Sequence, residues 1–286
     1  MKGEDKMVKQ LLIAQDLSSV GGVSLGIAVP VLASYHQRTT ILPTMLLSSH
    51  TGGFGVPVKS DTSPLIQSFK EQWATIPIQF TGAYLGYLGT VESIKAMGSL
   101  LAELSDVEKM TTIDPVMADH GHLYSGMTTD YVNELRMLCL AQADLILPNL
   151  TEAYLLAELD YQENPSELEV DQLLKQLLKK LNLKAVVITG VTNQQNKIGV
   201  AFRTAGNESG WVLKEKREQH YFGTGDLLAS CVVGELMTGK ALEEALRFAV
   251  EVTWKAMSVS DKEVLDGRLG VNFMSILPDI NQRMGN

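Results

Sequence analysis

The sequence places an aspartate directly behind two glycines at the start of an apolar helical run, in YFGTGDLLAS (residues 221–230). A glycine-rich turn at a helix N-terminus points backbone N–H groups and the positive end of the helix dipole at one spot, which favours an anion such as phosphate. We therefore expect Gly223, Thr224 and Gly225 to stabilise a phosphoryl group in transfer, and Asp226 to accept the proton of an attacking hydroxyl. An N-cap aspartate after a tight turn is the alternative for these four letters alone.

Two further segments supply the oxygen ligands that Mg²⁺ prefers. IDPVMAD contributes Asp114 and Asp119, and PNLTE contributes Asn149 and Glu152. Because Mg²⁺ usually keeps several waters while it bridges substrate phosphates, a few such side chains are enough. A favourable charge in the first turn of a helix is the alternative for Glu152.

These residues must be positioned by a sheet, because short runs rich in Val, Ile and Leu alternate with longer helical patterns. The runs lie near residues 12, 42, 80, 113, 146 and 187, and NKIGVAFR (196–203) and SGWVLKEKRE (209–218) follow as two more strands joined by the turn AGNESG. Residues 166–183 form the clearest amphipathic helix, and the C-terminal third is helical. The alternation predicts one α/β domain over residues 1–286, a three-layer α/β/α sandwich with a mainly parallel central sheet, in which residues 1–7 form a flexible tail.

Ligands of such sheets bind outside the carboxyl ends of the strands. Polar residues follow every predicted strand up to residue 190; they are Asp16, residues 48–53, Tyr87, Asp114 with Asp119, Asn149 with Glu152, and Thr189. Any one of them could be a cap or a turn residue. Together they predict a single site at this edge.

Composition excludes several classes of function. The chain has a net charge of −9 without a basic cluster, which argues against nucleic acid or anionic membrane as a partner and favours a small molecule. It contains neither an apolar run of membrane-spanning length nor the apolar core of a signal peptide. Cys139 and Cys231 lie far apart in helical patterns, as buried cysteines of a reducing compartment would. We therefore expect a cytoplasmic protein.

Two motifs suggest chemistry that their context does not support. GELMTGKA (234–241) resembles a phosphate-binding loop but lacks the final Ser or Thr and the preceding strand, so we expect a helix C-terminus capped by Gly239. Asp119, His120 and His122 in DHGH suggest a transition-metal site, but no further ligand has suitable spacing, and a polar loop is the better interpretation.

Five segments in order along nearly the whole chain resemble the pyridoxal (vitamin B6) kinases of the ribokinase-like superfamily. They are SSHTGG (48–53), GYLG (86–89), DPVMAD (114–119), PNLTE (148–152) and GTGD (223–226). The segment DLSSVGGVSL (16–25) is most similar to the bacterial branch of that family.

The resemblance implies ATP-dependent phosphorylation of the 5′-hydroxymethyl group of pyridoxal, with Asp226 as the base and Gly223, Thr224 and Gly225 as the anion hole. It implies that Asp16, Thr51 and Tyr87 line the pyridine-ring pocket. It further implies that Asp114, Asn149 and Glu152 manage Mg²⁺, and that Asp119, Tyr124, Asn149 and Thr189 contact ATP. A homodimer is usual in the family, and a requirement for a monovalent cation is left open.

The chain departs from the family pattern at Ala118, where Gly is general, and at Gln15, Gly22 and Val23. Alternatives are the hydroxymethylpyrimidine kinases of thiamine synthesis, which usually have Ala-Gln-Asn-Thr where this chain has SSHT, and, less well matched, the ribokinase-type sugar kinases. A non-catalytic binding protein on the same fold is a further alternative. Residues 118–127 and 207–221 are candidates for closing over ATP.

Overall fold

The structure, a computed structural model, describes residues 7–104, 110–263 and 266–285. Its main feature is one nine-stranded sheet with the strand order β11-β10-β9-β8-β5-β4-β1-β2-β3. The strands of this sheet are β1 (Val8–Ser18), β2 (Thr39–Leu47), β3 (Lys59–Asp61), β4 (Ile78–Leu85), β5 (Met110–Ile113), β8 (Leu145–Ile146), β9 (Ala185–Thr192), β10 (Lys197–Thr204) and β11 (Ser209–Glu215). A separate hairpin pairs β6 (Ala118–Asp119) with β7 (His122–Leu123).

The centre of the sheet is parallel, and both of its ends are antiparallel. From β2 through β1, β4, β5 and β8 to β9 every neighbouring pair is parallel. The pairs β2 with β3, β9 with β10 and β10 with β11 are antiparallel. The parallel strands therefore end at one edge, where the sequence predicts the site.

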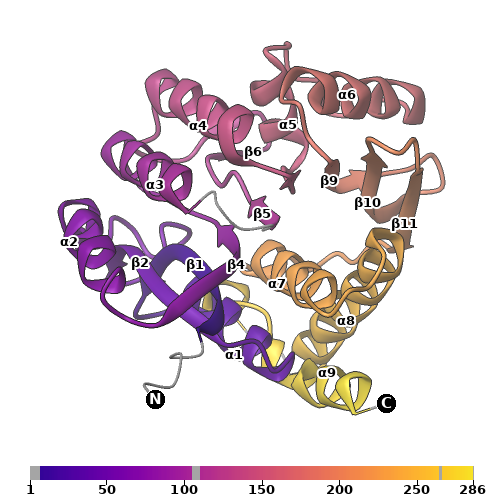
Figure 1. The fold of residues 1–286 in the computed structure, drawn as a ribbon. Helices are drawn as coiled ribbons and strands as arrows, with labels where there is room; N and C mark the ends of the chain where they lie inside the picture. Colours follow the sequence, from indigo (N-terminus) through magenta and orange to yellow (C-terminus); the bar gives the residue numbers. More distant parts are fainter. Residues whose placement is uncertain (1–6, 105–109, 264–265, 286) are drawn as a thin grey trace.

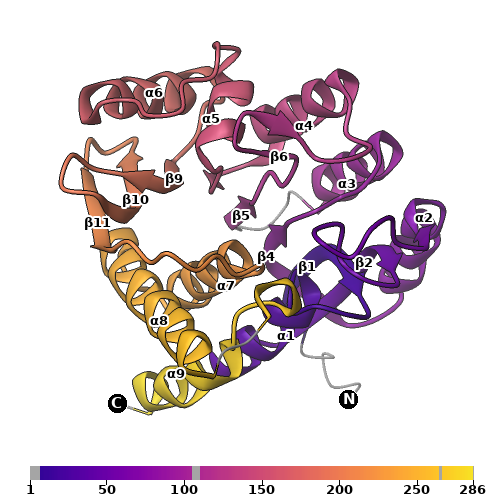
Figure 2. The ribbon, with the colours of Figure 1, turned by 180° about the vertical axis from the view of Figure 1, so that it is seen from behind.

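Helices cover both faces of the sheet and make it three-layered (Figures 1 and 2). One layer contains α2 (Ser63–Trp73), α3 (Val91–Glu103), α4 (Thr129–Gln142), α5 (Leu150–Ala157) and α6 (Glu167–Lys180). The other contains α1 (Leu25–Ser34), α7 (Thr224–Met237), α8 (Leu242–Glu263) and α9 (Leu277–Met284), with two short 3₁₀ turns, Gly267–Leu269 and Phe273–Ile276. The predicted fold class is confirmed.

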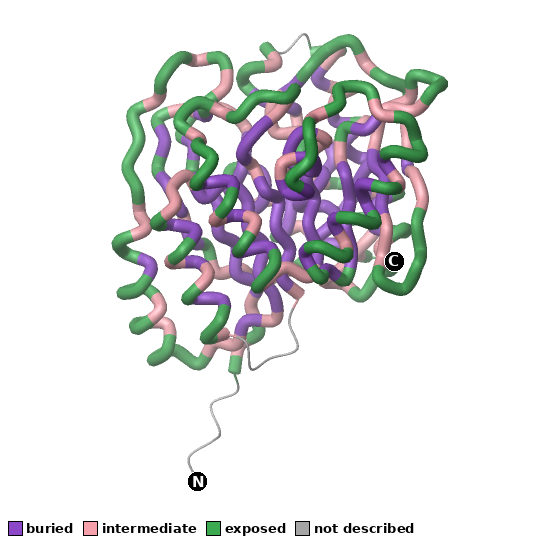
Figure 3. The backbone as a smooth tube through the Cα atoms, turned by 90° about the horizontal axis from the view of Figure 1, so that it is seen from above, coloured by how far each residue is buried: buried purple, intermediate pink, exposed green. Residues whose placement is uncertain are grey.

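Burial explains why the central strands appear in the sequence as continuous apolar runs. Residues 11–16 of β1 are all buried because both faces of this central strand are covered. Figure 3 shows the buried backbone concentrated between the two helical layers. No helix in the described part of the chain is long and apolar enough to cross a membrane.

The structure confirms the predicted strands and the helix at 166–183, which begins after the N-cap Ser166 and ends at Lys180. It also confirms the cap of the false phosphate-binding loop. α7 ends at Met237, Gly239 has φ 87°, and the N–H groups of Gly239 and Lys240 donate to the carbonyls of Leu236 and Glu235. These two hydrogen bonds are the ones that satisfy the last carbonyls of a helix capped by glycine.

Four expectations about element boundaries need correction or fall outside the described residues. Asp16 and Thr189 lie inside β1 and β9 rather than after them. β1 has an irregularity in its pairing with β2 at Asp16, and β9 continues past its parallel partner β8. Residues 209–215 of the proposed closing segment 207–221 form β11, which is hydrogen-bonded to β10. Residues 1–6 of the predicted tail lie outside the described residues.

Candidate active site

The GTGD turn forms the N-terminus of α7, as predicted. Gly223 is the N-cap with φ 78°, and a Cβ there would lie 2.1 Å from the carbonyl oxygen of Gly22, so only glycine fits. Beside Gly225, in contrast, no atom lies within 4 Å of where a Cβ would be. The first-turn N–H groups of α7 have no partner within the helix.

Asp226 lies in the first turn of α7 and is half-buried. The pKa of its carboxyl is raised to about 6, mainly by burial; a hydrogen bond from the backbone N–H of Ser24 opposes this rise and the charge of Asp16 adds to it. A carboxylate with a pKa near the working pH is suited to accept a proton from an alcohol.

Asp16 is buried in β1, at 3% exposure, and accepts a hydrogen bond from the Ser18 hydroxyl at 2.8 Å. Burial raises its pKa, and hydrogen bonds from Ser24 and Ser18 and the charge of His50 lower it. The buried Tyr87 lies near it, since after burial the charge of Asp16 is the cause that raises the pKa of the Tyr87 phenol. Two of the three predicted ring-pocket residues are thus brought together.

The third, Thr51, is exposed on a loop that is fastened to the GTGD turn by His50. The Nδ1 atom of His50 accepts from the Gly52 N–H at 3.1 Å, so its Nε2 carries the proton and donates to the Arg268 carbonyl at 2.5 Å. The His50 ring packs on Phe222, with 4.6 Å between ring centroids. Phe222 directly precedes the GTGD turn.

Glu152 and Asn149 hold the loop before Asp119. The buried Glu152 carboxylate accepts from the backbone N–H groups of Met117 (3.0 Å), Ala118 (3.4 Å) and Asn149 (2.9 Å), while the Asn149 amide donates to the Ala118 carbonyl at 2.7 Å. These bonds involve only the backbone of Ala118, so the alanine in place of the family's glycine is accommodated. Burial nevertheless raises the pKa of Glu152 to about 8.

Asp114 connects this loop electrostatically to the base. It follows β5 and is buried; burial raises its pKa well above the usual range, and the charges of Glu152 and then Asp226 raise it further. A nearby cation would stabilise the ionised form of such a desolvated carboxyl group. The hard oxygen donors present here fit Mg²⁺, although the Glu152 and Asn149 side chains already have protein partners.

The predicted nucleotide contacts border the same acids. The charges of Glu152, Asp119, Asp114 and Asp226 all contribute, after burial, to a raised pKa of the Tyr124 phenol. Thr189 forms an isolated parallel bridge with Asn149, and its hydroxyl donates to the Pro148 carbonyl at 3.4 Å. Apart from Thr51, which belongs to the adjoining loop, the predicted site residues are thus linked into one constellation.

The expected polar loop at DHGH is a tight hairpin with Asp119 and His120 side chains 3.6 Å apart. Within residues 7–104, 110–263 and 266–285, no three His, Cys, Asp or Glu side chains converge as a metal cluster. Cys139 and Cys231 are buried free thiols.

Sequence reasoning gave no role to Ser18 and Ser24, which lie within DLSSVGGVSL, and it named His50 only as part of the segment 48–53. Their signal was present, since polar residues between a buried strand and a helix at the ligand edge are candidates by position alone. What could not be read was which of them face the two aspartates.

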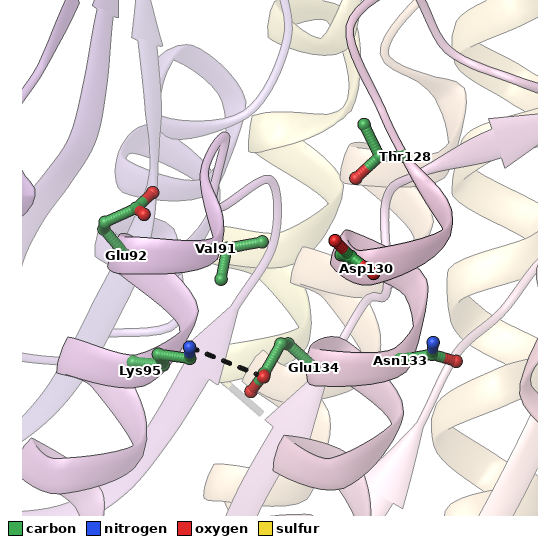
Figure 4. A pocket seen from close by; sticks show the side chains of 7 residues that line it. All are labelled: Val91, Glu92, Lys95, Thr128, Asp130, Asn133 and Glu134. Carbon is green, nitrogen blue, oxygen red and sulfur yellow. Dashed lines mark ion pairs between the residues drawn. The ribbon is translucent and has the colours of Figure 1, made fainter.

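Two hollows lie on the surface, and neither is lined by a predicted site residue. One lies between α3 and α4, crossed by an ion pair of Lys95 with Glu134 at 3.6 Å, and none of its lining residues was a predicted site residue (Figure 4). The other is lined by residues 216–219, Tyr221 and Asp261, and therefore adjoins the GTGD turn.

Comparisons with known proteins agree with this arrangement. A family model described as phosphomethylpyrimidine kinase matches residues 61–272. A pyridoxine/pyridoxal/pyridoxamine kinase of Bordetella avium is 28% identical over 79% of this chain and 77% of its own. The crystal structure of pyridoxal kinase from Lactobacillus plantarum is 35% identical, with a TM-score of 0.88 over 97% of this chain and 98% of that one. A Bacteroides thetaiotaomicron protein assigned provisionally as a phosphomethylpyrimidine kinase, in a crystal form with pyridoxal, is 30% identical, with a TM-score of 0.90 over 96% of both chains.

Proposed function

Because the chain belongs to the phosphomethylpyrimidine kinase family, we propose that it transfers the γ-phosphoryl group of ATP to the 5′-hydroxymethyl group of pyridoxal, giving pyridoxal 5′-phosphate. Pyridoxamine and pyridoxine are further substrates in this proposal. The observation that carries it is the position of Asp226, a carboxyl with a pKa of about 6 at the glycine-rich N-terminus of α7, next to Asp16. The likeness to the Lactobacillus and Bordetella kinases supports the choice of acceptor.

In the transfer step, Asp226 accepts the proton of the 5′-hydroxyl while that oxygen attacks the γ-phosphorus, and the bond from the γ-phosphorus to the β,γ-bridging oxygen breaks, so that ADP leaves. The N–H groups at Thr224 and Gly225, in the first turn of α7, have no partner within the helix and stabilise the charge on the transferring group. A carboxylate is tolerated beside this anion site because it serves as the base for the acceptor alcohol.

The pyridine ring lies against Asp16 and Tyr87, with the exposed Thr51 on the loop that covers it. The buried Asp16 offers a carboxylate to a ring N–H or hydroxyl, and the Tyr87 side chain offers an aromatic face. The fastening of the 48–53 loop through His50 keeps Thr51 close to the GTGD turn.

Mg²⁺ would neutralise charge on the ATP phosphates. Asp114 is the direct ligand in this proposal, and Glu152 and Asn149 act through water, because their own side chains hold the 117–118 backbone. Asp119, Tyr124 and Thr189 border the phosphates on the same side.

Hydroxymethylpyrimidine phosphorylation is the second candidate, favoured by the description of the matching family. Both acceptors present a hydroxymethyl group on a nitrogen heterocycle, so the same base and anion hole would serve either. They differ in the groups that face Asp16 and Thr51.

We further propose that the protein acts as a homodimer, supported by apolar side chains at the β2–β3 end of the sheet. Leu46 and Val58 are 44% and 80% exposed there, and Leu17, the neighbour of Leu46 in the parallel register, is 41% exposed.

The experiment that tests the function is ADP release with MgATP and pyridoxal, pyridoxamine, pyridoxine, hydroxymethylpyrimidine or ribose as acceptor. We expect turnover with the B6 compounds that falls by about two to four orders of magnitude in Asp226→Ala and Asp226→Asn. Preference for hydroxymethylpyrimidine would select the second candidate. Tight pyridoxal binding without turnover would indicate a binding protein.

A further inference from the structure

Ser24 holds a backbone conformation that side chains rarely adopt, in a buried position. Its φ and ψ are 46° and −127°, and only 6% of it is exposed. Six other non-glycine residues in the described part of the chain have positive φ, and all of them are exposed: His36, His120, Glu158, Asn182, Asn196 and Asn207. Such strain persists only where the surroundings impose it, and it is concentrated at functional sites.

The surroundings that impose it are the GTGD turn and the Gly267–Leu269 turn. The N–H group of Gly22 donates to the Leu269 carbonyl at 2.8 Å, and the carbonyl of Gly22 lies directly against Gly223. On the other side of Ser24, the Ile27 side chain also contacts Gly223. The segment 22–27 is thus held against the start of α7 both before and after Ser24.

Ser24 uses its polar groups outside its own helix. It is the N-cap of α1, yet its side chain makes no capping hydrogen bond to that helix. Its hydroxyl instead hydrogen-bonds to Asp16 and thereby lowers the pKa of that carboxyl, and its backbone N–H does the same for Asp226. One residue therefore contacts both carboxylates, each with a different atom.

We propose that Ser24 is a positioning residue that fixes the general base relative to the ring pocket: its backbone N–H orients Asp226 and its hydroxyl orients Asp16. The proposal rests on the proposed function, in which Asp226 takes the proton and Asp16 faces the pyridine ring. The strained backbone is what lets a single residue reach both, because relaxation to an ordinary N-cap conformation would turn the N–H away from Asp226.

Two substitutions at Ser24 separate its two roles. Ser24→Gly removes the hydroxyl but adopts the same backbone freely, so the bond to Asp226 is kept. We expect KM for pyridoxal to rise about tenfold, the scale of one hydrogen bond to a charged group, with kcat within about twofold of the original. Ser24→Ala also removes the hydroxyl, but alanine, unlike glycine, disfavours this backbone conformation, and the hydrogen bond to Asp16 no longer helps to hold it. The backbone should then relax, so we expect the same rise in KM and, in addition, a fall in kcat of about tenfold or more.

Two serine variants complete the comparison. Ser18→Ala removes the other hydroxyl on Asp16 and should raise KM without lowering kcat. Ser34→Ala, at the far end of α1, where the hydroxyl donates to the Pro30 carbonyl at 3.1 Å, should leave both constants unchanged. Thermal melting of each variant shows whether it is folded, and should Ser24→Ala fail to fold, Ser24→Gly and Ser18→Ala still test the role of the hydroxyl.

Equal kinetic constants for Ser24→Gly, Ser24→Ala and the unchanged chain would overturn the proposal. So would a fall in kcat of the same size in both Ser24 variants, which would indicate a merely structural serine. Absence of turnover by the unchanged chain with every acceptor would instead contradict the proposed function, and the positioning role with it.

Discussion

The chemistry at single residues depends on how far each carboxyl is removed from water. Asp226, Asp16, Asp114 and Glu152 all have pKa values raised mainly by burial. Charge adds to this at three of them, because Asp16 raises the pKa of Asp226, Glu152 and Asp226 raise that of Asp114, and Asp119 raises that of Glu152. Hydrogen bonds from serine and backbone donors lower the pKa of Asp226, Asp16 and Glu152, whereas burial and charge alone act on Asp114. Since no hydrogen-bond donor stabilises the ionised form of Asp114, a bound cation would have the larger effect there. Asp226, whose ionised form is stabilised by a donor, is suited to act as the base.

The first prediction concerns pH. Because the base must be ionised and its pKa is raised to about 6, kcat/KM should be constant above that value and fall as the pH decreases through it. Asp16→Asn removes a charge that raises this pKa, so the acidic limb should move to lower pH even though KM rises. The measurement is kcat/KM for pyridoxal between pH 5 and 9, the range bracketing the limb; a limb that stays in place in Asp16→Asn would show that the two carboxyls are not coupled.

The second prediction compares the two glycines of the GTGD turn. A Cβ at Gly223 would meet the Gly22 carbonyl oxygen at 2.1 Å and φ is 78°, so Gly223→Ala should destabilise the fold by about 1–3 kcal/mol and reduce activity. Gly225→Ala meets nothing within 4 Å, so it should keep the stability but obstruct the anion hole and lower kcat with ATP. Urea unfolding and ADP release measure both, and a stable, fully active Gly225→Ala would show that the phosphoryl group lies elsewhere.

The sequence predicts some residues of the candidate site but not the contacts between them. Asp226, Asp114 and Glu152 stand in motifs with a fixed relation to a strand or helix end, so their types and spacing predicted them. The interaction of Ser24 with both aspartates depends on a φ angle and on contacts of the nearby Gly22 with Gly223 and Leu269, which are far away in the sequence. Two of the three N–H groups that donate to Glu152, those of Met117 and Ala118, belong to backbone more than 30 residues away, so the residue types do not reveal these hydrogen bonds.

At the scale of elements, α7 connects the site to the end of the chain. Glu235 in α7 is 1% exposed and forms a two-pronged ion pair with Arg283 of α9, at 2.7 to 2.9 Å. A buried carboxylate keeps its charge favourably only while such a partner stays in place. The ion pair with α9 therefore helps to hold the C-terminal end of α7, the helix that has the base Asp226 in its first turn.

The third prediction tests this connection. Arg283→Ala leaves the Glu235 charge buried and unpaired, so it should lower the free energy of unfolding by about 3–5 kcal/mol. Lys255→Ala is the matched control, because Lys255 also pairs with a residue of α9, Asp279, at 2.8 Å, but with both side chains substantially exposed. It should change stability by less than about 1 kcal/mol. Equal effects of both variants in urea unfolding would mean that burial of Glu235 does not matter.

Elements could be predicted where burial imposes a period and missed where it does not. β1, β4 and β9 contain continuous buried apolar runs, and α6 has an amphipathic pattern after a capping box, so each was located within a few residues. The hairpin strands β6 and β7 have two residues each and no pattern to detect. β3 is a three-residue exposed edge strand whose place is set by its pairing with β2.

For the molecule as a whole, the β2–β3 end of the sheet is more apolar than a free surface requires. Leu46 lies beside Leu17 in the parallel register and opposite Ser60 in β3, and Val58 is two residues before Ser60, so by strand alternation the three apolar side chains share one face. All three are more than 40% exposed. They adjoin the 48–53 loop, which links this face to the ring pocket.

The last prediction is that this face joins two copies of the chain. Leu46→Glu and Val58→Glu each place a charge in the proposed interface and should convert the dimer to a monomer of 31.3 kDa, as measured by sedimentation at micromolar concentrations. Leu168→Glu is the control, because Leu168 is equally apolar and 66% exposed but lies on α6 at the other end of the sheet; it should leave the mass unchanged.

Since the 48–53 loop carries Thr51 and begins directly after β2, the monomeric variants should also bind pyridoxal more weakly while ATP binding is retained. A dimer that survives both glutamates would place the contact on another face, and a monomer in the unchanged chain would show that these leucine and valine side chains are exposed for a different reason.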